Sequence, residues 1–176
     1  DYECPTVVTD KNHSSCGQSR FGCWTCTVVK EDKSMTALIK NGENWLAPLL
    51  KYRDSLVEER NISENRMATR RNGQAAVTED GHKQGNYAPE YRAKKLRELL
   101  ELQKDIQKTN PLVELITNQE LIAIQVYWYR DGIFDFKVGE IYAKIFGREI
   151  ETENSNIEST IEKQLLKNIC QQEPKD

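Results

Sequence analysis

The 176-residue sequence predicts a mainly α-helical protein in which a loop-rich cysteine segment precedes about six helices. Apolar residues recur at helical spacing from residue 34 onward, and glycine or proline pairs interrupt them. Residues 1–33 lack this periodicity and contain four of the five cysteines. Charged residues make up 30% of the chain and hydrophobic residues 38%, which is typical of globular proteins.

We therefore divide the chain into three regions. Residues 1–33 are predicted to form a cysteine-rich metal or cluster loop, residues 34–150 a helical domain, and residues 151–176 a linker with a C-terminal amphipathic helix. No apolar run approaches the roughly 20 residues that a membrane-spanning helix needs. Because the chain opens on Asp1 rather than Met, we expect it to be cut from a longer protein.

The first two helices follow directly after the cysteines. Ser34 is expected to cap a short helix, which the turn pair Asn41-Gly42 ends. A second helix is predicted over residues 43–59, with Pro48 in its first turns, where a missing N–H does least harm.

A third helix is predicted over residues 61–72, and residues 73–87, with three glycines, are expected to be irregular. The clearest helical pattern covers residues 89–108, which begin with proline and carry leucines at helical spacing.

Two further helices and a terminal one complete the prediction. Thr117 and Glu120 form a T-x-x-E capping box before an apolar run, which predicts a helix start. Another short helix is expected over residues 138–146, and a final amphipathic helix carries apolar residues between positions 157 and 169.

The cysteine spacing C-x11-C-x6-C-x2-C indicates a metal site with Cys4, Cys16, Cys23 and Cys26 as ligands. Two residues between Cys23 and Cys26 allow both thiolates to converge on one centre. Four thiolates suit tetrahedral zinc or an iron–sulfur cluster, and this spacing leaves the choice open. A tight group of four with one distant thiol, Cys170, favours a reducing cytoplasm over a disulfide framework.

Charge is unevenly distributed along the chain. Residues 60–108 hold 11 Lys or Arg against 7 Asp or Glu, whereas both flanking regions are acidic. Such a basic region permits contacts with DNA phosphates, although a solvated helical surface explains it equally well. The candidate DNA contacts are Arg66, Arg70, Arg71, Arg92, Lys94, Lys95 and Arg97.

The string SRFGCWTCTVV, from Ser19 to Val29, is long and uncommon. Together with Glu3-Cys4-Pro5 before it and Asp32 to Met35 after it, this string resembles the cysteine region of the DndC family. These are the sulfurtransferases of bacterial DNA phosphorothioation, in the phosphoadenosine-phosphosulfate-reductase-like group. The resemblance continues more weakly to Cys170.

The resemblance implies a [4Fe–4S] cluster on the four cysteines, in the C-terminal part of a larger α/β ATP-pyrophosphatase-type protein. It also implies a transferase that incorporates sulfur into the DNA backbone as phosphorothioate, within a DNA-modification and restriction-modification system. DNA, a cysteine desulfurase as sulfur donor and the other Dnd-system proteins would be its partners.

No phosphate-loop string occurs in these 176 residues, so we expect ATP to be used only through a preceding domain and the fragment alone to be inactive. The alternative function is a structural zinc module that binds nucleic acid or protein without catalysis.

Overall fold

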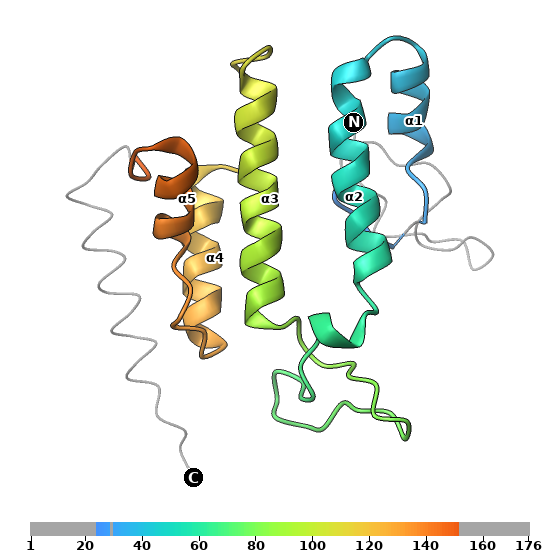
Figure 1. Cartoon of the computed structure of the whole chain (residues 1–176), viewed down its shortest axis with the longest axis vertical. Coiled ribbons are helices and arrows are strands. Elements are labelled where there is room, and N and C mark those ends of the chain that lie inside the picture. The colour runs from blue at the N-terminus through green and yellow to red at the C-terminus, as the bar shows by residue number, and fades with distance from the viewer. Residues whose placement is uncertain (1–23, 29, 152–176) are drawn as a thin grey trace, which may run out of the picture. The chain divides into compact units, whose positions relative to one another are not determined.

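The computed structural model describes residues 24–28 and 30–151 (Figure 1). The chain divides into two compact units, Asp1–Ala88 and Pro89–Asp176, and the boundary falls inside the region 34–150. The described elements of unit 1 are α1 (Lys33–Lys40), the 3₁₀ turn η1 (Asn44–Leu46), α2 (Ala47–Glu59) and the 3₁₀ turn η2 (Ser63–Asn65). Those of unit 2 are α3 (Pro89–Gln107), α4 (Asn118–Arg130) and α5 (Val138–Phe146).

The predicted mainly α-helical class is confirmed for the part of the chain that the structure describes. Within that part, no helix is both long and apolar enough to cross a bilayer. The predictions for residues 1–23 and for the terminal amphipathic helix lie outside the described residues.

Helix α1 begins earlier than predicted, because Asp32 rather than Ser34 is its N-cap. The Asp32 carboxylate accepts a hydrogen bond from the amide of Met35 at 2.9 Å. A carboxylate caps at least as well as a serine hydroxyl, and its charge also favours the positive end of the helix dipole. The predicted end is confirmed at Asn41, followed by Gly42 with φ of 109°.

The helix predicted over residues 43–59 is divided into η1 and α2. A continuous α-helix would require the amide of Pro48 to donate to the carbonyl of Asn44, but proline has no N–H and its ring clashes there. The chain forms a 3₁₀ turn first, and α2 starts at Ala47 with the proline in its first turn. Leu46 and Leu49 are buried on either side of this junction.

The helix predicted over residues 61–72 is wrong, because only η2 is helical there. Residues 66–87 instead form two small hairpins held by isolated antiparallel bridges. The amide of Met67 donates to the carbonyl of Asn86 at 2.7 Å, and the amide of Ala76 donates to that of Ala68 at 2.7 Å. These bonds to residues distant in sequence replace the local helical bonds that the apolar spacing alone indicated.

Gly85 lies close against the backbone of Met67 and Thr69 in this hairpin region. A Cβ atom built there would lie 2.1 Å from the carbonyl oxygen of Thr69 and 2.5 Å from that of Met67. Both neighbours are backbone atoms, which cannot move aside as a flexible side chain can. The position therefore requires glycine because of space, and its backbone angle is ordinary.

The described part of unit 2, residues 89–151, agrees closely with the sequence prediction. Both hydrogen bonds of the capping box at the start of α4 are present between Thr117 and Glu120. Helix α5 ends at Gly147, whose φ of 71° is left-handed and accommodates glycine without strain. Helix α5 contacts both α3 and α4.

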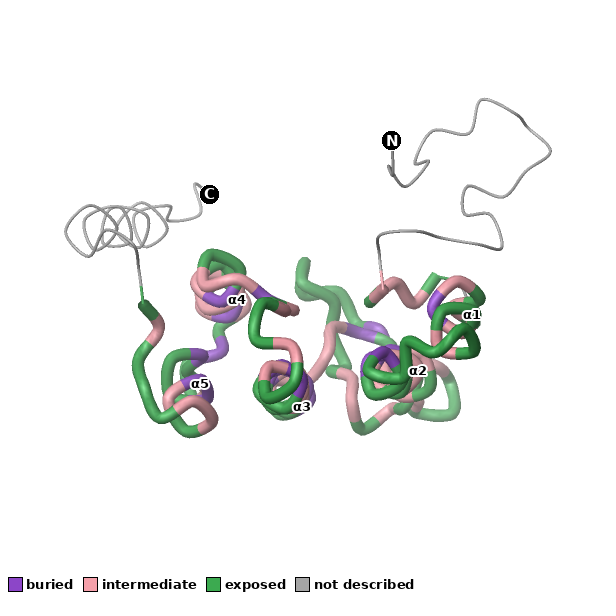
Figure 2. The backbone as a smooth tube through the Cα atoms, turned by 90° about the horizontal axis from the view of Figure 1, so that it is seen from above, coloured by how far each residue is buried: buried purple, intermediate pink, exposed green. Residues whose placement is uncertain are grey.

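The core of unit 2 consists of apolar residues from all three helices and the loops between them. Leu100, Leu121 and Val138 are at most 1% exposed and lie at its centre. In Figure 2 each of the three helices carries both buried and exposed positions, as amphipathic helices do. Gln103 is a buried polar residue beside this core, and its Oε1 accepts from the amides of Leu115 and Ile116 at 2.6 and 3.1 Å.

Replacing Gly85 by alanine should destabilise the hairpin region by about 1–3 kcal/mol, since the new methyl group overlaps two backbone carbonyls. Hydrogen exchange of the Met67 and Asn86 amides measures the local opening free energy directly. Gly139→Ala is the matched control. Gly139 lies in α5, and a Cβ built there meets nothing within 4 Å. That control should be neutral or slightly stabilising. Unchanged protection in Gly85→Ala would contradict the close approach.

Candidate metal centre

Of the four predicted metal ligands, only Cys26 belongs to the described part of the chain. Cys4, Cys16 and Cys23 lie outside it, as does Cys170. Among the described residues, no group of three or more His, Cys, Asp or Glu is placed to hold a metal ion. The ligand set therefore stays a prediction, and the structure contributes the surroundings of Cys26.

The buried guanidinium of Arg53 holds the main chain that carries Cys26. Its Nη2 donates to the carbonyl of Cys26 at 3.2 Å, and its Nη1 donates to the carbonyl of Lys30 at 2.6 Å. Nη1 also lies 2.8 Å from the carboxylate of Asp54. The side chain of Arg53 is only 1% exposed, so these acceptors compensate a cation that is nearly removed from water.

Two further contacts fasten the same segment to α2 and its C-cap. Arg60, the C-cap residue, donates from Nη1 to the carbonyl of Thr27 at 2.6 Å. The indole of Trp24 packs on the ring of Tyr52 with centroids 5.8 Å apart and planes tilted by 49°. Trp24, Cys26, Thr27 and Lys30 are thus held from α2 and its C-cap by two guanidinium groups and one aromatic ring. We call Arg53 and Arg60, with the three carbonyls they bind, the arginine clamp.

Sequence reasoning missed Arg53, although a signal was present. Arg53 follows Leu49 by four residues and precedes Leu56 by three, so it lies on the apolar face of α2. A basic residue on such a face must find acceptors inside the protein. Its partners could not be read from the sequence, because they are main-chain carbonyls more than 20 residues away.

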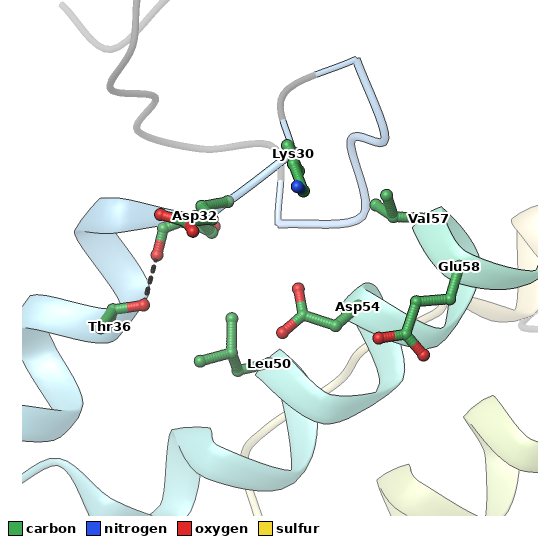
Figure 3. A pocket seen from close by; sticks show the side chains of 8 residues that line it. Lys30, Asp32, Thr36, Leu50, Asp54, Val57 and Glu58 are labelled. Atoms are coloured by element: carbon green, nitrogen blue, oxygen red, sulfur yellow. Dashed lines mark hydrogen bonds between the residues drawn. The ribbon is translucent and has the colours of Figure 1, made fainter.

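A cavity of about 230 Å³ lies beside the clamp, between the segment that carries Lys30, the start of α1, and α2. Figure 3 shows Leu50 and Asp54 extending from α2 toward the segment with Lys30 and Asp32. Its charged lining is Lys30, Glu31, Asp32, Asp54 and Glu58. Four carboxylates against one ammonium group disfavour a phosphate or another anion in this cavity.

The half-buried thiol of Cys26 is compatible with metal ligation. Thiolate ligands carry negative charge, and the guanidinium groups of Arg53 and Arg60 bind the carbonyls of Cys26 and of the next residue, Thr27. The residues present therefore fit a thiolate-bound metal or cluster at this position.

Arg66, a candidate DNA contact, is used inside unit 1. Its guanidinium stacks on the ring of Tyr87 at 3.8 Å from the centroid. Its Nε donates to the carbonyl of Arg60 at 2.6 Å and its Nη1 to that of Gly85 at 3.1 Å. Arg66 therefore joins the end of α2 to the hairpin region.

Arg70 and Arg71 are exposed in the turn that closes the first hairpin, where the amide of Gly73 donates to the carbonyl of Arg70 at 2.9 Å. The second turn is acidic. There the Thr78 hydroxyl donates to the carboxylate of Asp80, and this bond lowers the pKa of Asp80. The two turns therefore differ in charge at neutral pH, with Arg70 and Arg71 in the first and Glu79 and Asp80 in the second.

The four candidate DNA contacts of unit 2 have different surroundings along α3. Arg92 pairs with the Asp131 carboxylate at 2.6 Å, and Lys95 is buried beside Glu98 at 2.8 Å. Lys94 is about half exposed, and Arg97 lines a cavity of about 460 Å³ between α3 and α5. Arg92 and Lys95 thus contribute to packing, whereas Lys94 and Arg97 are accessible to a ligand.

Comparison of the chain with known protein families, with curated proteins and with solved structures finds no match. The resemblance to the DndC family therefore depends on the quoted residues alone.

Replacing Arg66 by glutamine should loosen residues 66–87 by about 1–3 kcal/mol, because two carbonyls lose a charged donor and Tyr87 loses its cation. Hydrogen exchange at Met67 and Asn86 is again the measurement. Arg70→Gln, with the same loss of charge at an exposed turn, should change this value by less than about 0.5 kcal/mol. Equal effects of the two substitutions would show that charge, rather than the contacts of Arg66, is responsible.

Proposed function

We propose that this chain is the iron–sulfur-cluster-bearing C-terminal region of a DNA sulfurtransferase. Cys4, Cys16, Cys23 and Cys26 would ligate a [4Fe–4S] cluster. The observation that carries the proposal is the string from Ser19 to Val29, with its close cysteine pair and family-like sequence. The anchoring of Cys26 by the arginine clamp supports it, because a ligand on a held main chain needs less ordering when the cluster binds.

Each residue near Cys26 would then have a defined task. When bound, the cluster would supply electron or sulfur relay, or a structural link to the preceding domain. Cys26 would provide a thiolate, and the arginine clamp would hold its main chain. Trp24, packed on Tyr52, would cover one side of the centre against water.

The proposal assigns the enzymatic activity to the full-length protein, a transferase of the ATP-pyrophosphatase type. ATP would be bound by an N-terminal domain, and sulfur would come from a cysteine desulfurase. DNA and the other Dnd-system proteins would be further partners, in a bacterial cytoplasm. The alternative, a structural zinc module for nucleic-acid or protein binding, is favoured by the same observation of four thiolates with one close pair.

Anaerobically prepared protein should contain about four iron and four sulfide per chain and show broad visible absorption. Cys26→Ser should lose most of both, because serine is a poor ligand for this cluster. Cys170→Ser is the matched control and should keep the full iron content. One zinc per chain with no iron or sulfide would contradict the proposal and favour the zinc module.

Exposed arginines at the first hairpin turn should contribute to duplex DNA affinity. The double substitution Arg70→Ala/Arg71→Ala should weaken binding and reduce the slope of log affinity against log salt by about 0.9 for each phosphate that is no longer neutralised. Lys40→Ala/Lys51→Ala removes the same charge from exposed positions of α1 and α2 and should leave the slope nearly unchanged. Equal weakening in both double variants would indicate a general charge effect without a site.

A further inference from the structure

Arg53 is the most buried charged side chain among the described residues of unit 1. Burial of a guanidinium is unfavourable unless acceptors replace the water that it loses. The carboxylate of Asp54 is one acceptor, but its side chain is 46% exposed and needs no buried partner. The contacts that require Arg53 to be buried are those to the carbonyls of Cys26 and Lys30.

The geometry of these contacts uses a property that arginine has and lysine lacks. A guanidinium donates from separate nitrogens in a fixed planar fork, whereas an ammonium is a single point. The two nitrogens of Arg53 reach two carbonyls four residues apart, those of Cys26 and Lys30. Arg60, seven residues further along, holds Thr27 between them. Three carbonyls are thereby bound from two positions, Arg53 in α2 and Arg60 at its C-cap.

We propose that Arg53 and Arg60 are positioning residues of the metal centre. The arginine clamp fixes the main chain of Cys26 before a metal or cluster binds, so that Cys26 is the preformed corner of the site. It also holds two guanidinium groups, that of Arg53 paired with Asp54, on the main chain at a residue that would be a thiolate ligand. This inference rests on the proposed function, in that it needs a thiolate-bound centre at Cys26.

A preformed ligand has consequences for the stability of the bound centre. Because part of the ordering cost is met by folding of unit 1, loss of the centre to a chelator should be slow in the wild-type protein. Outer contacts that orient a ligand typically change metal affinity by about 10–100-fold when removed. Removal of a positive charge near the centre should also make its reduction harder.

The test compares the variants Arg53→Lys, Arg53→Gln and Arg60→Gln of the 176-residue chain, each prepared anaerobically. The measured quantities are the rate of iron loss to a ferrous chelator and the midpoint reduction potential. Lys51→Gln is the matched control, since it removes one positive charge from an exposed position of α2. Arg53→Gln and Arg60→Gln should lose iron about 10-fold faster or more and have lower potentials. Arg53→Lys should lose iron faster while its potential changes less, because the charge is kept and the fork is lost.

The outcomes separate this inference from the proposed function. If the wild-type protein binds iron and sulfide but both glutamine variants behave like Lys51→Gln, the arginine clamp has no positioning role and the cluster assignment stands. If the wild-type protein binds zinc alone, the cluster assignment fails. Faster zinc release to a chelator from Arg60→Gln than from Lys51→Gln would then support the positioning role, and equal release would overturn it.

If the Arg53 variants do not fold, as judged by circular dichroism, the half-exposed Arg60 decides the question. The positioning role would be overturned if Arg60→Gln lost iron only as fast as it unfolds globally and kept the wild-type reduction potential.

Discussion

The guanidinium of Arg53, buried on the apolar face of α2, binds the carbonyls of Cys26 and Lys30 and thereby fastens these two residues to α2. A guanidinium in this position cannot be left without acceptors, because burial removes the water that would otherwise solvate it. The residues that supply those acceptors are therefore fastened to α2. Arg60 and the Trp24–Tyr52 contact act on the same segment and depend on the same placement.

This arrangement changes what the N-terminal segment requires from a metal. The sequence of residues 1–33 has no apolar pattern, which on its own predicts that metal ligation is the main source of order there. The clamp supplies order at the C-terminal end of that segment through hydrogen bonds to the main chain. Every residue has a main-chain carbonyl that can accept a hydrogen bond. The side chains of residues 24–30 therefore do not predict that Arg53 and Arg60 bind there.

The sequence predicted the described part of unit 2, residues 89–151, well because its determinants are local. The capping box of Thr117 and Glu120 and the left-handed Gly147 each lie within one turn of the element that they delimit. Unit 1 was predicted less well because its determinants are distant or compete with one another. Pro48 divides a helix whose apolar spacing continues through it, and Asp32 displaces Ser34 as a cap.

The hairpin region is the clearest case of distant determinants. Apolar spacing over residues 61–72 favoured a helix, but Arg66 stacks on Tyr87 and Met67 bonds to Asn86 across the chain. Such pairings are decided by residues that a local window does not contain. In the sequence, Gly85 was the available clue, because a glycine can mark a close approach of two backbones. In the structure, a Cβ at this position would meet the carbonyls of Thr69 and Met67.

The positive charge of residues 60–108 shows why net charge is a weak guide to a nucleic-acid surface. Arg66 is bound to the carbonyls of its own unit, and Arg92 and Lys95 are paired with carboxylates in unit 2. The donors of these cations are already engaged inside their own units, so they are less available to an approaching phosphate. The more exposed cations are Arg70 with Arg71 in unit 1, and Arg97 with Lys94, which pairs with Glu98 at 3.7 Å, in unit 2. The DNA-contact hypothesis is thereby reduced from a charged region to two small groups of side chains, each of which can be substituted while Arg66, Arg92 and Lys95 keep their partners.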